Sequence, residues 1–158
     1  MPQNPTVRSA TRADIPVLVE FNAAMAWETE RKRLDQRRLA RGIEGPFEQP
    51  GRGRYFVAEF AGAVVGSLLV TYEWSDWRDG DWWWIQSVYV SEPARRKGVF
   101  RALYAELERL ARATPRVVGL RLYVEWENLR AQETYRALGM NQCHYHQYER
   151  AFVELATG

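Results

Sequence analysis

The most informative part of the sequence reads Val88-Tyr89-Val90-Ser91-Glu92-Pro93-Ala94-Arg95-Arg96-Lys97-Gly98-Val99-Phe100-Arg101-Ala102-Leu103. It predicts the end of a strand, a basic loop that contains glycine, and the first turn of an amphipathic helix. The free N–H groups and the dipole at the start of that helix would attract an anion, and the basic side chains add full charges. A phosphate or pyrophosphate fits such a site. Spacing alone does not separate it from a solvated basic loop.

Two other nucleotide-binding loops are excluded by their motifs. The chain contains neither G-x-x-x-x-G-K-[ST] nor G-x-G-x-x-G. The loop is therefore neither a Walker A loop nor the phosphate-binding turn of a dinucleotide fold.

Outward from this loop, the pattern predicts alternating strands and helices. Strands are expected at Thr6–Ser9, Tyr55–Phe60, Val64–Trp74, Trp82–Val90, Val117–Trp126 and Cys143–Tyr148. Helices are expected after the capping box that begins at Thr11, at Trp27–Arg41, from Val99 to about Thr114, and at Leu129–Leu138. This order indicates an α/β domain with a mixed sheet, in which a helical crossover joins one strand.

Length and composition limit the remaining classes. The chain has 158 residues, 46% of them hydrophobic and 27% charged, which is typical of one globular domain. A formal net charge of +2 makes a weak case for nucleic acid. The single cysteine, Cys143, allows no internal disulfide, and the N-terminus has no signal-peptide pattern. The longest charge-free apolar run, Ala61–Tyr72, is too short to span a membrane, so we expect a cytoplasmic protein.

Two motifs together resemble the GNAT superfamily of acyl-CoA-dependent N-acetyltransferases. The pyrophosphate loop of that family reads R/Q-x-x-G-x-G/A, and Arg95–Phe100 matches it except at Phe100, where the family has a small residue. A second family segment, N-x-x-A-x-x-x-Y-x-x-x-G-F, is matched in spacing by Asn128, Ala131, Tyr135, Gly139 and Met140.

The resemblance implies a fold and an activity. It implies one GNAT domain over residues 1–158, with a mixed central sheet of about six to seven strands and about four helices, splayed between strands four and five. The expected reaction is direct transfer of an acetyl group from acetyl-CoA to an amine of a small molecule or a protein. The oligomeric state stays open, with a homodimer as the candidate assembly.

By position, the resemblance also assigns residues to the acyl donor. A backbone amide near Val88 would stabilise the oxyanion, and the Tyr135 phenol would protonate the departing thiolate. Alternatively, Tyr135 only packs its helix and Asn128 only caps it. The residues expected to contact acetyl-CoA are Val88, Tyr89, Val90, Arg95, Arg96, Lys97, Gly98, Val99, Phe100, Arg101, Asn128 and Tyr135.

The general base and the acceptor pocket are less defined. Relatives often have a glutamate on the fourth strand, where this chain has Gln86, an amide that cannot accept a proton as a carboxylate does. Other candidates for the base are Glu28, Glu30, Asp76, Glu125 and Glu127. The acceptor pocket is expected to use Trp27, Glu28, Glu30, Trp74, Asp76, Trp77 and Gln86, because aromatic rings and carboxylates suit a cationic amine. The alternative is that the aromatic residues belong to the core.

Three further alternatives concern a metal site, a sensor and a nucleic-acid partner. His144 and His146 could share one strand face, but they have no evident further ligands, and we expect no metal. Without a carboxylate base, the chain could be a CoA-binding sensor that does not catalyse. Its arginines and tryptophans could also stack on nucleic acid, although the dispersed charge argues against that partner.

Overall fold

A computed structural model describes residues 3–155, which form two compact units, residues 3–121 and residues 122–155. The first unit contains all the strands that the structure describes. The second contains helix α4 (Leu129–Ala137). No helix in residues 3–155 is both long enough and apolar enough to cross a membrane.

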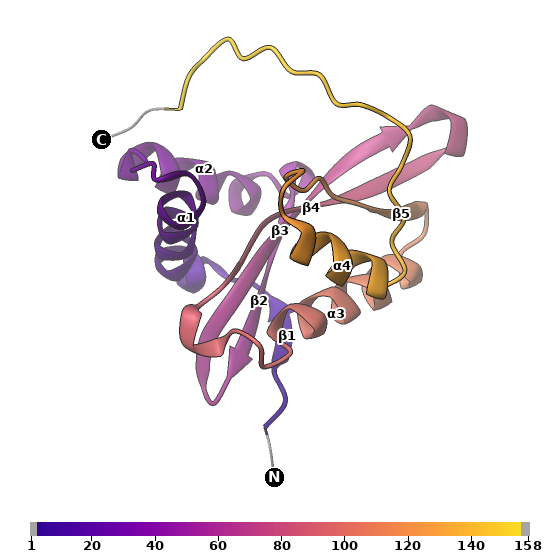
Figure 1. The fold of residues 1–158 in the computed structure, drawn as a ribbon. Coiled ribbons are helices and arrows are strands. Elements are labelled where there is room, and N and C mark those ends of the chain that lie inside the picture. Colours follow the sequence, from indigo (N-terminus) through magenta and orange to yellow (C-terminus); the bar gives the residue numbers. More distant parts are fainter. Residues whose placement is uncertain (1–2, 156–158) are drawn as a thin grey trace. The chain divides into compact units, whose positions relative to one another are not determined.

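The first unit is built on a five-stranded sheet in the order β1-β2-β3-β4-β5 (Figure 1). The strands are β1 (Thr6–Ser9), β2 (Arg54–Phe60), β3 (Ala63–Ser75), β4 (Gly80–Val90) and β5 (Val117–Arg121). The first four are antiparallel neighbours, and β5 lies parallel to β4. This confirms the expected mixed sheet. Two parallel neighbours need a crossover connection, which α3 provides between β4 and β5.

Helices cover both faces of this sheet (Figure 1). On one face, α1 (Ile15–Glu30) and α2 (Gln36–Glu48) bury Leu18 and Ile43 against Tyr55 and Val57. On the other face lies α3 (Val99–Ala113), whose buried residues include Val99, Leu103 and Leu107. Their spacing of four residues places them on one helical face, as expected from the sequence.

The structure corrects the expected elements in three places. The sheet has five strands, not about six to seven, because no strand forms at Cys143–Tyr148. Alternating residues form a strand only when a neighbour takes up the backbone hydrogen bonds. The strand expected at Val117–Trp126 is shorter and ends at Arg121.

The third correction concerns the helix expected at Trp27–Arg41. Trp27 belongs to the last turns of α1, which ends where Arg31 adopts a left-handed conformation with φ 54°. The next helix begins after Asp35, whose side chain accepts a hydrogen bond from the Arg38 N–H at 2.9 Å. Asp35 is thus the N-cap that separates the two helices.

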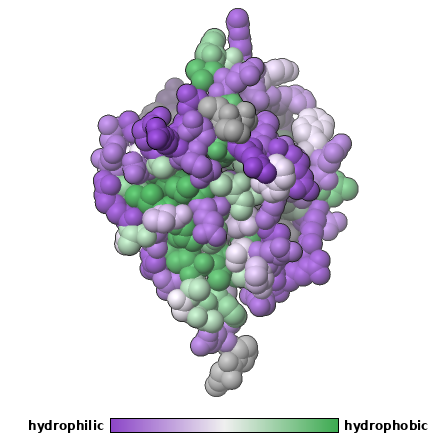
Figure 2. Space-filling model, turned by 90° about the vertical axis from the view of Figure 1, so that its left-hand side faces the viewer, coloured by the Kyte–Doolittle hydropathy of each residue, from purple (hydrophilic) through white to green (hydrophobic). Residues whose placement is uncertain are grey.

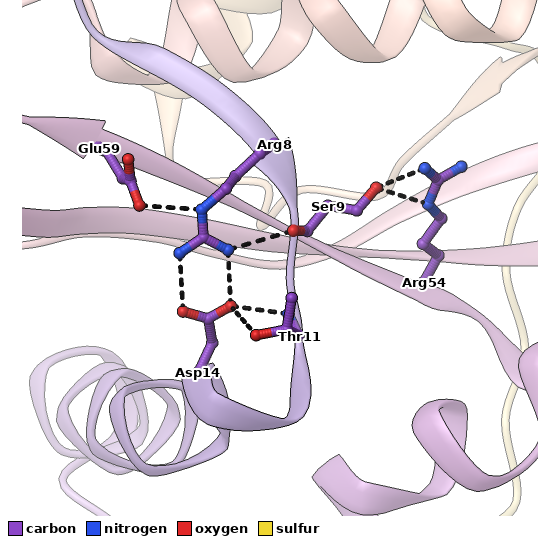
Figure 3. A network of polar contacts seen from close by, with 6 residues as sticks. All are labelled: Arg8, Ser9, Thr11, Asp14, Arg54 and Glu59. Atoms are coloured by element: carbon purple, nitrogen blue, oxygen red, sulfur yellow. Dashed lines mark hydrogen bonds and ion pairs between the residues drawn. The ribbon is translucent and has the colours of Figure 1, made fainter.

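A charged network ties β1 to the start of α1 and to β2 (Figure 3). Arg8 donates two hydrogen bonds to the buried Asp14 carboxylate, at 2.7 and 3.0 Å, and one to Glu59 at 2.9 Å. The Asp14 carboxylate also accepts from the Thr11 N–H at 2.7 Å, as the predicted capping box requires. The hydrogen bonds from Arg8 are the main reason why the pKa of Asp14 is lowered.

Candidate active site

The basic loop enters α3 through two left-handed residues. Arg96 has φ 64° and Gly98 has φ 78°, and α3 begins directly afterwards. The first backbone bond in the helix runs from the Ala102 N–H to the Gly98 carbonyl, at 3.0 Å. The amides of Val99 and Arg101, in the first turn, therefore have no acceptor within the helix. No side chain caps this end, and its first turn carries no acidic residue.

Three cations surround this helix start. Arg96, Lys97 and Arg101 are exposed, and within residues 3–155 none of them forms an ion pair. Unpaired cations beside open helix amides create a strong local preference for an anion. This loop could therefore hold a diphosphate.

Phe100 occupies the position where the related loop has a small residue. Its ring centroid lies 6.3 Å from that of Tyr104, one helical turn further on. The aromatic ring thus packs along the helix against a buried tyrosine. The larger side chain is thus accommodated against Tyr104.

Strand β4 separates from β5 just before this loop. Their pairing covers Asp81 to Trp84, and Trp84 is opposite Arg121, the last residue of β5. β4 continues as far as Val90. Among the described residues, the part of β4 from Ile85 onward therefore has a neighbouring strand, β3, on one side only.

A β-bulge lies within this separated part of β4. Ser67 pairs with Tyr89 and Leu69 with Gln86, so Ser87 and Val88 together are opposite the single residue Leu68. Ser87 has φ 51°, a conformation that is costly for any residue with a side chain. A bulge bends its strand and redirects the groups beside it, and such strain is concentrated at functional sites. Val88, the expected oxyanion donor, lies in this bulge.

Next to the bulge, Gln86 is one of a row of polar side chains. Its amide donates a hydrogen bond to the Thr71 hydroxyl on β3. Two residues along β3, the Glu73 carboxylate accepts from the Trp84 indole at 2.9 Å and from Arg121 at 2.7 Å. We did not single out Glu73 from the sequence. Its signal was the alternation of Leu69, Thr71 and Glu73, which places this carboxylate on the same sheet face as Gln86.

Three residues expected in the acceptor pocket lie at the end of α1. Glu28 contacts the basic loop, because Arg95 donates to its carboxylate at 2.6 Å. Trp27 is partly exposed, and the guanidinium groups of Arg31 and Arg33 lie 5.4 and 5.2 Å from its ring centroid. Glu30 forms an ion pair with Lys32.

Three other residues expected in the acceptor pocket, Trp74, Asp76 and Trp77, lie at the β3–β4 hairpin. Trp74 is the residue before the end of β3, and Asp76 begins the short turn Asp76–Arg78 at the tip of the β3–β4 hairpin. Leu69 is the strand partner of Gln86. Trp74 lies five positions further along β3, a separation of about 17 Å along a strand. Trp74 and Trp77 are exposed.

From the side on which α1 and α2 lie, apolar surface is bordered by hydrophilic residues (Figure 2).

The second unit carries the remaining assigned residues. Asn128 caps α4, and its side-chain oxygen accepts from the Ala131 N–H at 3.1 Å. Tyr135 is half-buried, and its burial raises the pKa of the phenol above the ordinary value of 10.0. Glu125 and Glu127 are exposed in the segment before the helix.

Known proteins share sequence and fold with this chain. The sequence model described as the acetyltransferase (GNAT) family matches residues 18–140. A crystal structure of a possible acetyltransferase from Clostridium difficile 630 is 39% identical, with a TM-score of 0.88 over 96% of this chain and 100% of that one. Glucosamine-6-phosphate N-acetyltransferase from Arabidopsis thaliana, at 17% identity, shares the fold, with a TM-score of 0.72 over 96% of this chain and 100% of that one.

A curated relative has a longer chain. Mycothiol acetyltransferase of Mycolicibacterium smegmatis is 32% identical in an alignment of 153 positions that covers 88% of this chain and 48% of the relative. The chain thus spans about half the length of that protein.

Proposed function

Because this chain belongs to the acetyltransferase (GNAT) family, we propose that it transfers an acetyl group from acetyl-CoA directly to a primary amine of a small molecule or a protein. The observation that carries the proposal is the start of α3. There, the first-turn amides of Val99 and Arg101 follow two left-handed residues, and within residues 3–155 the three flanking cations form no ion pair with a carboxylate.

The loop binds the diphosphate of the acyl donor. The amides of Val99, Phe100 and Arg101 donate to phosphate oxygens, and Arg96, Lys97 and Arg101 supply positive charge. Gly98 keeps its backbone accessible, because it has no side chain and adopts φ 78°. The packing of Phe100 against Tyr104 supports this role despite the departure from the family motif.

The separated part of β4 receives the pantetheine arm and the thioester. The strand amides near Val88 and Val90, freed by the split, donate to the pantetheine and to the carbonyl oxygen on which negative charge develops. The amine nitrogen attacks the carbonyl carbon, the carbon–sulfur bond breaks, and the sulfur leaves as a thiolate. The bulge at Ser87 and Val88 supports this proposal, because it redirects a backbone group at the required place.

Tyr135 donates the proton that the thiolate takes up. A phenol whose pKa lies above 10 is fully protonated at neutral pH and can act as the general acid. The amine loses its own proton through water to one of the carboxylates. The acceptor of mycothiol acetyltransferase is not assigned to this protein, because this chain spans only 48% of that relative.

One observation favours a second function, a CoA-binding protein without turnover. The side chain at the position of the family's common glutamate is Gln86, and its amide is hydrogen-bonded to Thr71. An amide in this place cannot accept the proton of the attacking amine.

A binding and turnover experiment tests both functions. Titration calorimetry with CoA and acetyl-CoA would compare the native chain with Arg96→Gln, Arg101→Gln and, as the control, Arg109→Gln. Arg109 lies further along α3, where it pairs with Glu106. Loss of one charge-assisted phosphate contact, about 1.5–3 kcal/mol, weakens binding about tenfold to hundredfold at Arg96 or Arg101 but leaves the control unchanged.

Turnover then separates the enzyme from the sensor. Thiol release from acetyl-CoA would be followed over a panel of amines, with Tyr135→Phe beside the native chain. An enzyme releases thiol with at least one amine, and loss of the hydroxyl lowers kcat about a hundredfold. CoA binding without turnover on any amine identifies the sensor, and absence of binding refutes both functions.

A further inference from the structure

One arginine of the basic loop is already bound. The Arg95 Nη2 donates to the Glu28 Oε2 at 2.6 Å, and its Nε donates to the Val90 carbonyl at 2.9 Å. The Glu28 carboxylate belongs to α1, 67 residues earlier in the chain. The guanidinium therefore joins the last turns of α1 to the end of β4.

Tyr89 completes this junction. Its hydroxyl donates to the Glu28 Oε1 at 2.9 Å, so each carboxylate oxygen has one donor. The Arg95 guanidinium lies 5.6 Å from the centroid of the Tyr89 ring. That ring also packs against Phe21 of α1, with centroids 5.1 Å apart. Burial raises the pKa of the Glu28 carboxyl, but the hydrogen bonds from Arg95 and Tyr89 outweigh burial and leave the pKa lowered.

Arg95 is followed immediately by the residues that need restraint. Arg96 is left-handed, although it carries a side chain, and Gly98 is left-handed as well. A loop in this conformation persists only when its surroundings hold it. The anchored Arg95 precedes this strained pair, and the first turn of α3 follows it.

From this arrangement we propose that Glu28 is a positioning residue for the acyl donor. Through Arg95 and Tyr89 it holds the loop in the conformation that presents the α3 amides to the diphosphate. Arg95 then acts as an anchor of the loop and not as a ligand of the phosphates. This proposal rests on the proposed function, and it replaces the acceptor-binding role expected for Glu28 from the sequence.

The sign of one substitution distinguishes the two roles of Arg95. If Arg95 anchors the loop, Glu28→Gln loosens it, and the affinity for CoA falls about tenfold, as expected for the loss of one charge-assisted bond. If Arg95 is a phosphate ligand held back by Glu28, the same substitution releases it, and CoA binds more tightly. Glutamine has nearly the size of glutamate, and Glu20→Gln on the exposed side of α1 is the matched control.

Calorimetry would measure the affinity for CoA of the native chain, Glu28→Gln, Arg95→Gln, the double variant and the control. The expected result is weaker binding in both single variants and a loss in the double variant that is smaller than the sum of the two, because the single variants share the Arg95–Glu28 interaction. Unchanged or tighter binding in Glu28→Gln overturns the proposal, and so do additive losses in the double variant.

A second measurement does not depend on CoA. Hydrogen exchange of the unliganded protein would follow the amides of residues 96–101 in the native chain, Glu28→Gln and the control. Exchange in Glu28→Gln is expected to be faster in this segment and unchanged in the remainder of α3. Unchanged exchange overturns positioning by Glu28 even if CoA binds. If the native chain does not bind CoA but exchange in Glu28→Gln is still faster in residues 96–101, the donor site is refuted and the anchoring of the loop by Glu28 is supported.

Discussion

Gly66→Ala is expected to disturb the start of α3 from the strand beneath it. A Cβ added to Gly66 would lie 2.9 Å from the Val99 Cγ1 and 3.1 Å from the Tyr89 carbonyl oxygen. Val99 is 2% exposed and is the first residue of α3. Because a β-branched side chain in a helix has one preferred rotamer, Val99 cannot swing aside, and the helix backbone must move.

The expected cost follows from this contact. Forcing an extra carbon into a well-packed core costs about 1–3 kcal/mol. For a chain of this length, 2 kcal/mol corresponds to a melting temperature about 4–8 °C lower. The movement begins at the residue whose amide faces the proposed diphosphate, so we also expect CoA to bind about tenfold more weakly.

Urea unfolding and CoA calorimetry would measure the two effects. Gly42→Ala is the matched control, because a Cβ at Gly42 meets nothing within 4 Å. Gly42 lies inside α2, where alanine is the better helix former, so the control should be as stable as the native chain or more stable by up to about 1 kcal/mol. Native stability and native CoA affinity in Gly66→Ala would refute the proposed packing between β3 and the start of α3.

Two further substitutions test other parts of the first unit. Asp14→Asn removes the charged partner of Arg8 and should lower the free energy of unfolding by about 2 kcal/mol in urea unfolding, which makes native stability the contrary result. Because the folded-state pKa of Asp14 is lowered, the carboxylate stabilises the fold above its ordinary pKa of 3.8, and this stabilisation is lost as the pH falls through the lower folded value. Asp14→Asn lacks this contribution at every pH. The difference in the free energy of unfolding between the two proteins should therefore shrink on acidification. Gly119→Ala would place a Cβ 2.5 Å from the Trp82 ring, which Arg121 covers at 3.9 Å, and we expect a loss of about 1–3 kcal/mol. Gly51→Ala, where a Cβ meets nothing within 4 Å, is its control, and equal unfolding midpoints for the two variants would contradict the contact.

Local sequence patterns predicted most elements of the first unit. The spacing of Val99, Leu103 and Leu107 marked the buried face of α3, and the helical crossover predicted the parallel pair of β4 and β5. These signals act over a few residues, where periodicity and turn chemistry dominate. The boundary between α1 and α2 was wrong because the N-cap Asp35 was overlooked.

The basic loop was also evident from its residues, but its conformation was not. Sequence reasoning assigned Arg95 to the cofactor and Glu28 to the acceptor, whereas the structure pairs them at 2.6 Å. Similarly, nothing in the run of β4 signalled the bulge at Ser87, which depends on the pairing with β3. Strand register arises from two segments together, and neither segment specifies it alone.

The amino-acid order was sufficient for the family, the basic loop and the order of elements through α3, because each depends on neighbours in the chain. Only the tertiary structure decided which charges meet: Arg8 with Asp14 and Glu59, and Arg95 with Glu28. The last two of these contacts join residues 51 and 67 positions apart. Such pairs form where packed strands and helices bring side chains within hydrogen-bond distance, and the folding of the whole sheet sets that geometry.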